Sequence, residues 1–259
     1  MPRQTKTAEG GQGASVIENT VAILRCFSPD RQLLGVTEIA QQVGLHKSTV
    51  SRTLASLERE GIVEQDASRR YRLGLGILAI AGPLLADLDV RRAGYPVLQD
   101  LTERTGETSA LMVWNGTEAI TVEQIPSTHQ VKHTSSLGSR YATALSASVQ
   151  VFLSGEDPKH VRELLSDGVL TGVKKSAMAA YLERLAQIAE LGYAVNGAET
   201  SSEEVGVSAP VRDHRGAIAA AVLIAAPRFR VDDAAMTELG KQCAEAASHI
   251  TRRLGGPAS

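Results

Sequence analysis

Hydrogen-bond donors and cations gather in one short stretch of the chain, residues 46–52. Val50, Leu54 and Leu57 recur at helical spacing across it, which predicts a helix that buries one face. The opposite face carries His46, Lys47, Ser48, Thr49, Ser51 and Arg52. A helix N-terminus already favours anions through its free N–H groups and dipole. The pattern indicates a helix for the DNA major groove; the alternative is an ordinary solvated helix face.

The neighbouring elements favour the first interpretation. Ser15, followed three residues later by Glu18, predicts a capped first helix that ends near residues 28–29. Residues 37–43 predict a short second helix, and Gly44 supplies a tight turn before the helix at 46–60. Residues 62–64 and 71–73 predict two strands around a polar turn. This order is typical of a winged helix-turn-helix, in which Arg69, Arg70 and also Arg72 would contact phosphate or the minor groove.

Composition limits the class of protein. The chain has 259 residues, enough for two domains, and a net charge of −2 excludes a protein that coats DNA by bulk charge. A surplus of two positive charges nevertheless lies in residues 1–83, which hold ten Lys/Arg and eight Asp/Glu. No signal peptide is visible, and the longest apolar run, residues 217–226, is shorter than the roughly 20 residues that span a bilayer. We therefore expect a cytoplasmic protein.

The rest of the chain alternates between helical and strand patterns. Residues 75–101 are helical, with a break expected at Gly82-Pro83. We expect strands at 108–113, 119–125, 129–135, 193–196, 206–212 and 218–225, and helices at 142–153, 158–165, 176–191 and 232–254. Turn signals separate two of the strand pairs, at Asn115-Gly116 and at residues 213–216. The predicted fold class is α+β.

Five blocks in the same order resemble the IclR family of transcription regulators. They are the recognition helix at 45–52, the wing end at 71–74, and the blocks at 106–108, 191–194 and 209–213. The resemblance implies a GAF-like effector-binding domain, a homodimer or homotetramer, and a palindromic operator. It also implies regulation, mostly repression, of catabolic genes in response to small organic acids or aromatic compounds.

The resemblance sets the predicted boundaries. We expect a disordered tail at 1–14, a winged helix-turn-helix domain at 15–74, a linker helix at 75–101 and an effector-binding domain at 102–259.

The resemblance also assigns the effector pocket. The positions that match the family's pocket are Gln130, His133, Tyr141, Thr143, Ala144, Leu145, Asn196, Gly206, Leu223 and Ala225. Asn196 stands where the family usually has Asp, and Gly206 where a Cys is common. Leu223 and Ala225 replace frequent Ser residues, and the loop before Ala142 is shorter than in the family. These departures favour a larger, partly apolar or aromatic ligand over a tiny polar acid.

Structural roles are the alternative at several of these positions. His133 would then be a strand histidine bonded to a neighbour, Tyr141 a core residue and Thr143 a helix N-cap. Gly206 and Ala225 would be small because a helix packs on the sheet.

Three other functions are weighed against regulation. An enzyme would have to use His129, His133, His214, Cys243, Glu203 or Glu204, but none of these lies in a nucleophile, zincin or P-loop motif. We therefore predict no catalytic residue and no cofactor. A metal sensor would need His129 and His133 as ligands; no metal site is predicted. An architectural DNA-binding protein would leave the large second domain without a role.

Overall fold

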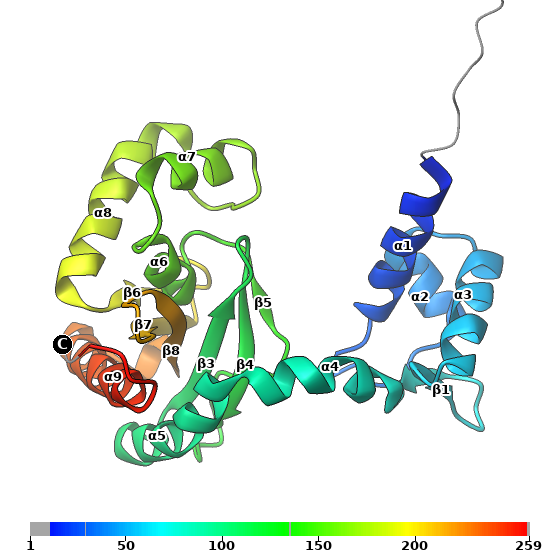
Figure 1. The fold of residues 1–259 in the computed structure, drawn as a ribbon, viewed down its shortest axis with the longest axis horizontal. Helices are drawn as coiled ribbons and strands as arrows, with labels where there is room; N and C mark the ends of the chain where they lie inside the picture. The colour runs from blue at the N-terminus through cyan, green and yellow to red at the C-terminus, as the bar shows by residue number, and fades with distance from the viewer. Residues whose placement is uncertain (1–10, 29, 135, 258–259) are drawn as a thin grey trace, which may run out of the picture. The chain divides into compact units, whose positions relative to one another are not determined.

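The computed structural model describes residues 11–28, 30–134 and 136–257. The chain forms two compact units, residues 1–87 and residues 88–259. Figure 1 shows the helical first unit in blue and cyan, and the sheet-containing second unit in green to red. Each unit has its own buried apolar core.

The first unit is a winged helix-turn-helix. Its elements are α1 (Gly11–Leu24), α2 (Val36–Val43), α3 (Lys47–Arg59), β1 (Val63–Gln65), β2 (Tyr71–Leu73) and α4 (Gly76–Asp87). The strands of the wing pair antiparallel, and Leu34 adds an isolated bridge to Tyr71. The predicted order of elements up to the wing is confirmed.

Apolar periodicity and two glycines shape this unit. Val50 and Leu54 of α3 are fully buried in its core. Gly44 ends α2 with a φ of 69°, a left-handed conformation that suits glycine. A side chain on Gly74 would collide with the carbonyl oxygen of Gly61, so only glycine lets the end of the wing approach the end of α3.

The second unit contains a six-stranded antiparallel sheet. Its strands lie in the order β5-β4-β3-β8-β7-β6. They are β3 (Thr108–Trp114), β4 (Ala119–Ile125), β5 (Arg140–Tyr141), β6 (Ala194–Asn196), β7 (Glu204–Arg212) and β8 (Ile218–Pro227). The helices are α5 (Asp89–Thr105), α6 (Ala147–Leu153), α7 (Pro158–Ser166), α8 (Met178–Leu191) and α9 (Asp233–Arg253), with short 3-10 turns at Lys175–Ala177 and Arg228–Arg230.

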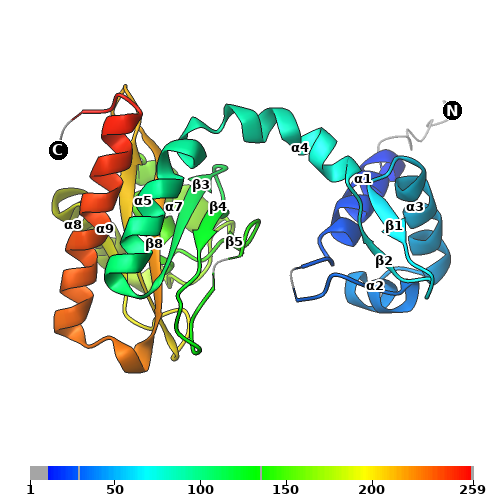
Figure 2. The same ribbon diagram turned by 90° about the horizontal axis from the view of Figure 1, so that it is seen from below.

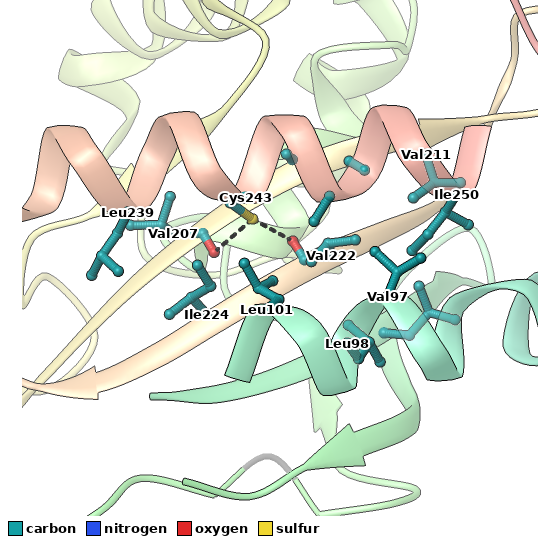
Figure 3. Close-up of a cluster of buried hydrophobic side chains, with 14 of the residues drawn as sticks. Val97, Leu98, Leu101, Val207, Val211, Val222, Ile224, Leu239, Cys243 and Ile250 are labelled. Atoms are coloured by element: carbon teal, nitrogen blue, oxygen red, sulfur yellow. Dashed lines mark hydrogen bonds between the residues drawn. The ribbon is translucent and has the colours of Figure 1, made fainter. Parts of the chain in front are cut away.

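Helices cover both faces of the sheet. Figure 2 shows α5 and α9 side by side on one face, and Figure 3 shows the aliphatic core between them and the sheet, including Leu98, Val222 and Cys243. The cluster on the opposite face holds residues of α6, α7 and α8. The predicted fold class, a winged helix-turn-helix followed by an α/β domain, is confirmed.

The linker prediction is wrong about the break. The helix runs through Pro83 and ends at Asp87; the next begins at Asp89, with Leu88 between them at φ −78° and ψ 70°. Proline inside a helix lacks the N–H donor, crowds the carbonyl four residues earlier and also crowds the residue before it. The absent Cβ of Gly82 relieves only the last of these effects, and α5 likewise runs through Pro96, which follows Tyr95. Neither proline ends its helix, so proline alone is a poor marker of a helix end in this chain. The helical segment predicted at 75–101 is therefore interrupted at Leu88 and not at Gly82-Pro83, and it continues to Thr105.

Three other elements differ from their predictions. The first helix begins at Gly11 and not at Ser15; the remainder of the predicted disordered tail, residues 1–10, lies outside the described residues. Residues 129–134 form no strand, because their backbone bonds go to side chains and not to a neighbouring strand. The helix predicted from Ala142 starts at Ala147, after Ser146 at the N-cap position.

In the described part of the chain, no helix combines the length and the apolar character needed to cross a membrane.

Candidate DNA-binding surface and effector site

The exposed face of α3 carries the predicted DNA-contacting side chains. His46, Lys47, Ser48, Ser51 and Arg52 are exposed, and Thr49 is half-buried. They occupy the N-terminal half of α3, where its free N–H groups add partial positive charge. Five of the six predicted residues of this helix are therefore accessible, and the sixth is partly so.

The turn of the wing presents Arg69. The Asp66 carboxylate accepts hydrogen bonds from the backbone N–H groups of Ser68 and Arg70, at 3.0 and 2.9 Å. The Ser68 hydroxyl and these N–H groups hold the pKa of Asp66 below its usual value. Arg69 follows in a left-handed conformation with a φ of 60°, and its side chain is exposed. The turn is therefore held by its own hydrogen bonds with a cation at its tip.

Arg70 is held within the fold. Its guanidinium lies 3.0 Å from the Glu38 carboxylate and donates to the carbonyl of Leu33 at 2.9 Å. The N–H of Gly35, together with Arg70, lowers the pKa of Glu38. Arg72 likewise pairs with Glu64 across the ribbon at 2.8 Å. Arg70 thus connects the wing to α2, a role that its position in the sequence did not indicate.

Four of the strands place small residues in one row. Thr108 of β3 pairs with Ala225 of β8, which pairs with Gly206 of β7, which pairs with Asn196 of β6. All four residues, here called the floor row, are buried. Leu223 lies one position along on the same face, beside Ala110. The structure therefore unites Asn196, Gly206, Leu223 and Ala225, as predicted from separate strands.

The start of α6 covers part of the floor row. A Cβ on Gly206 would lie 3.8 Å from that of Ala147 and 3.6 Å from Leu223, which is ordinary contact. Ala144 is fully buried, and its carbonyl accepts the Tyr181 hydroxyl at 2.6 Å. Because α6 packs against Gly206, a structural reason accounts for the small size of this residue. The contacts nevertheless leave room at Gly206 for one methyl group.

The other predicted positions surround this region. Tyr141 and Leu145 are half-buried, and Tyr141 packs against the α6 side of the sheet. Thr143 is not an N-cap, because Ser146 holds that position. The side-chain amide oxygen Oδ1 of Asn196 accepts the N–H of Glu199 at 2.7 Å and so closes the turn that follows β6.

Gln130 and His133 lie on a loop and not on a strand. Gln130 is exposed. The His133 ring lies near the start of β7, with Nε2 3.3 Å from the carbonyl oxygen of Glu203 and Nδ1 3.7 Å from the Glu204 carboxylate. Of the two, only His133 borders the floor row.

Sequence reasoning missed two polar residues near this site. Thr108 donates to the His133 carbonyl at 2.6 Å and accepts from Ser127 at 3.1 Å. Gln150 of α6 is fully buried; its Nε2 donates to the carbonyl of Leu145 at 2.8 Å, whereas its Oε1 has no partner among the described residues. A lone amide between Val149 and Val151 is a signal that the sequence did contain.

The groups proposed for other chemistry are dispersed. The described residues contain no cluster of three or more His, Cys, Asp or Glu side chains that could hold a metal ion. Cys243 is fully buried in α9, and burial raises the pKa of its thiol. Cys243 is thus packed in the core, where a thiolate nucleophile is disfavoured.

A winged helix-turn-helix with an exposed cationic recognition helix defines the class of DNA-binding transcriptional regulators. The family models agree: the IclR helix-turn-helix domain matches residues 16–67, and the bacterial transcriptional regulator IclR C-terminal domain matches residues 83–252. The chain belongs to the IclR family of bacterial transcriptional regulators. This family consists of regulators and not of enzymes.

Curated relatives align over almost the whole chain. The HTH-type transcriptional regulator KipR of Bacillus subtilis is 31% identical, over 92% of this chain and 96% of its own. The transcriptional repressor IclR of Escherichia coli is 27% identical, over 90% of this chain and 88% of its own.

Solved structures share the fold. One domain of an IclR family transcriptional regulator is 59% identical, with a TM-score of 0.64, and covers 66% of this chain and 99% of its own. An IclR homologue from Microbacterium hydrocarbonoxydans, solved with 4-hydroxybenzoate, is 22% identical, with a TM-score of 0.77 over 92% of this chain and 98% of its own. The second likeness concerns the fold alone.

Proposed function

We propose that this protein is a cytoplasmic, ligand-responsive repressor that binds a palindromic operator as a homodimer or as a tetramer of two such dimers. The observation that carries the proposal is the exposed donor and cation face of α3, beside a wing that presents Arg69. Arg52 is suited to a bidentate guanine or phosphate contact. The relative named as a repressor supports the direction of regulation.

Self-association follows from an apolar surface on the first unit. The segment 76–86 of α4 contains no charged residue, yet Leu78, Ile80 and Leu84 are 57, 70 and 66% exposed. Val16 and Ile17 of α1 are 60 and 68% exposed. A helix that is apolar all round needs a partner to cover it. A second copy is the partner we propose, because helix-turn-helix proteins read palindromic half-sites as symmetric dimers.

The effector proposal rests on the floor row and its surroundings. The two central residues, Ala225 and Gly206, present almost no side chain, and Leu223 lies beside them. None of the ten predicted pocket residues is Lys or Arg. Such a site favours a partly apolar or aromatic molecule over a small, highly charged acid. The homologue solved with 4-hydroxybenzoate supports a ligand of this kind.

The proposed mechanism is a population shift. Effector binding in the second unit changes the separation of the two DNA-binding units of a dimer, through α4 and α5. Half-sites lie about 34 Å apart, or a multiple of that, so small changes in separation alter operator affinity. The effector can shift the balance only by its different affinity for the two arrangements.

Fluorescence anisotropy tests the DNA-binding proposal. The full-length protein is titrated onto a labelled fragment from upstream of its own gene and onto a scrambled duplex, each at two salt concentrations. We expect tighter binding to the native fragment, with a preference that persists at the higher salt. Equal and steeply salt-dependent binding to both duplexes would contradict an operator in that fragment. No binding at low salt would contradict the proposed role of α3.

The same assay screens for the effector. Candidate aromatic and aliphatic acids are added to the protein–operator complex at equal concentration. We expect an aromatic compound to change the anisotropy at a lower concentration than a small, highly charged acid such as oxalate. The opposite ranking would contradict the proposed ligand class.

A further inference from the structure

The floor row has one end near the starts of β3 and β7. Thr108 is the first residue of β3, and Glu204 is the first residue of β7. β8 lies between these strands and contributes Ala225. At this end the segment 127–133, here called the strap, connects the start of β3 to the start of β7.

The strap is firmly attached on its β3 side. The Ser127 N–H donates to the Thr108 hydroxyl at 3.1 Å, and the Ser127 hydroxyl donates to the carbonyl of Gly106. The Thr108 hydroxyl in turn donates to the His133 carbonyl at 2.6 Å. Thr108 is 1% exposed, so water competes little for these bonds. Lys132 closes the strap on itself, since its ammonium donates to the Ser127 carbonyl at 2.8 Å.

The attachment on the β7 side is of a different kind. The His133 ring crosses from the β3 side to the start of β7, where Nε2 lies 3.3 Å from the Glu203 carbonyl and Nδ1 lies 3.7 Å from the Glu204 carboxylate. The side chains of His133 and Glu204 are 30 and 34% exposed. Partly exposed contacts of this length are weak, because water replaces them at little cost.

We propose that the His133 ring is a latch that fastens the strap to the start of β7 and controls passage of ligand to the floor row. When the ring leaves Glu203 and Glu204, the strap is no longer fastened to β7, while it keeps its bonds to Thr108, Gly106 and Arg230. The latch regulates the proposed effector site and rests on that proposal. Its test, however, needs neither effector nor DNA.

A thiol placed in the floor row reports whether the latch is open. Gly206→Cys puts the reporter there, since a Cβ at that position makes only ordinary contacts. The natural cysteines Cys26 and Cys243 are both buried, so they give a low background. The rate of modification by a thiol reagent in the full-length protein is then proportional to the population of the open state.

We expect His133→Ala to raise the modification rate of the Gly206→Cys thiol roughly tenfold or more. Glu204→Ala should raise it less, because the Glu203 carbonyl still holds the ring. His129→Ala is the matched control: it removes an exposed histidine from the same strap, and it should leave the rate unchanged. An unchanged rate in His133→Ala, or an equal rise in His129→Ala, would overturn the latch.

Modification of Cys243 in any variant would reveal general unfolding. If Gly206→Cys itself unfolds, hydrogen exchange of the protein with natural Gly206 replaces the thiol assay. His133→Ala should then accelerate exchange in residues 127–133 and in residues 201–204 together. Acceleration in neither segment, or in the strap alone, would overturn the proposal. A failed latch leaves the operator and effector titrations unaffected, so the two failures remain distinguishable.

Discussion

Arg52 is the side chain of α3 whose chemistry best suits base reading. A guanidinium on the exposed face can bind guanine O6 and N7 together. We expect Arg52→Ala to weaken binding to the native upstream fragment by about 1–3 kcal/mol and to relax the choice of base at one operator position. Anisotropy titrations on point-substituted duplexes measure both effects.

Arg59→Ala is the control for this prediction. Arg59 lies on the same helix, but in its last turn, with its guanidinium 3.2 Å from the Ser56 hydroxyl. Its removal should change affinity much less and should leave base preference intact. If Arg52→Ala instead weakened operator and scrambled duplexes equally, Arg52 would be a phosphate contact without a role in specificity.

Two carboxyl groups should make the first unit sensitive to acid. Bonds from the Gly35 N–H lower the pKa of Glu38, and bonds from Ser68 lower that of Asp66. When folding lowers the pKa of a carboxyl group, the charged carboxylate stabilises the folded state. This stabilisation is complete above the pKa in the unfolded state, about 3.9–4.3, and is lost as the pH falls through the pKa in the folded state. We therefore expect the protection factors of residues 30–74, which correct for the pH dependence of intrinsic exchange, to fall below about pH 4.

Asp66→Asn tests the contribution of the wing turn. The amide still accepts hydrogen bonds but does not titrate in this range. The variant should therefore lose part of the acid sensitivity of residues 63–73. An identical pH profile in the variant and the parent would show that Asp66 contributes nothing to it.

At the scale of elements, the contact between the wing and the end of α3 depends on glycine. A Cβ at Gly74 would collide with the Gly61 carbonyl oxygen, which is backbone and cannot turn away. We expect Gly74→Ala to destabilise the first unit by about 2 kcal/mol or more, measured by chemical denaturation. In contrast, Gly197→Ala meets no atom within 4 Å and should be neutral or slightly stabilising. Equal stability of the two variants would contradict the close approach.

At the scale of the whole molecule, the apolar surface of α4 should control association. Ile80→Glu places a charge on a helix that we propose to be covered by a second copy. Burying an unpaired carboxylate is costly, so the variant should sediment as a monomer. Its operator affinity should fall by about 10²-fold or more, because single half-sites then bind independently.

Gln187→Glu is the control for the association prediction. It introduces the same charge at an exposed position of α8, a helix of the second unit that is not part of the proposed surface. This variant should keep both its association state and its operator affinity. If Ile80→Glu also kept its association state in sedimentation velocity, the dimer would have to form elsewhere on the chain.

Local features were predictable wherever neighbouring residues decide them. The spacing of Val50, Leu54 and Leu57 sufficed to place a helix and its exposed face, because helical periodicity needs only residues a turn apart. Gly44 likewise marked the end of α2. The same local rules erred at Pro83, which α4 accommodates inside the helix although proline tends to end one.

The amino-acid sequence thus established the winged helix-turn-helix and the small apolar character of the predicted effector positions. Tertiary structure alone decided which of these residues meet. The floor row joins Thr108 to residues 196, 206 and 225 through strand pairing across distant parts of the chain. Arg70 pairs with Glu38, 32 positions away. Such contacts depend on how the chain closes its sheet and its wing, and local propensity carries no information about that register.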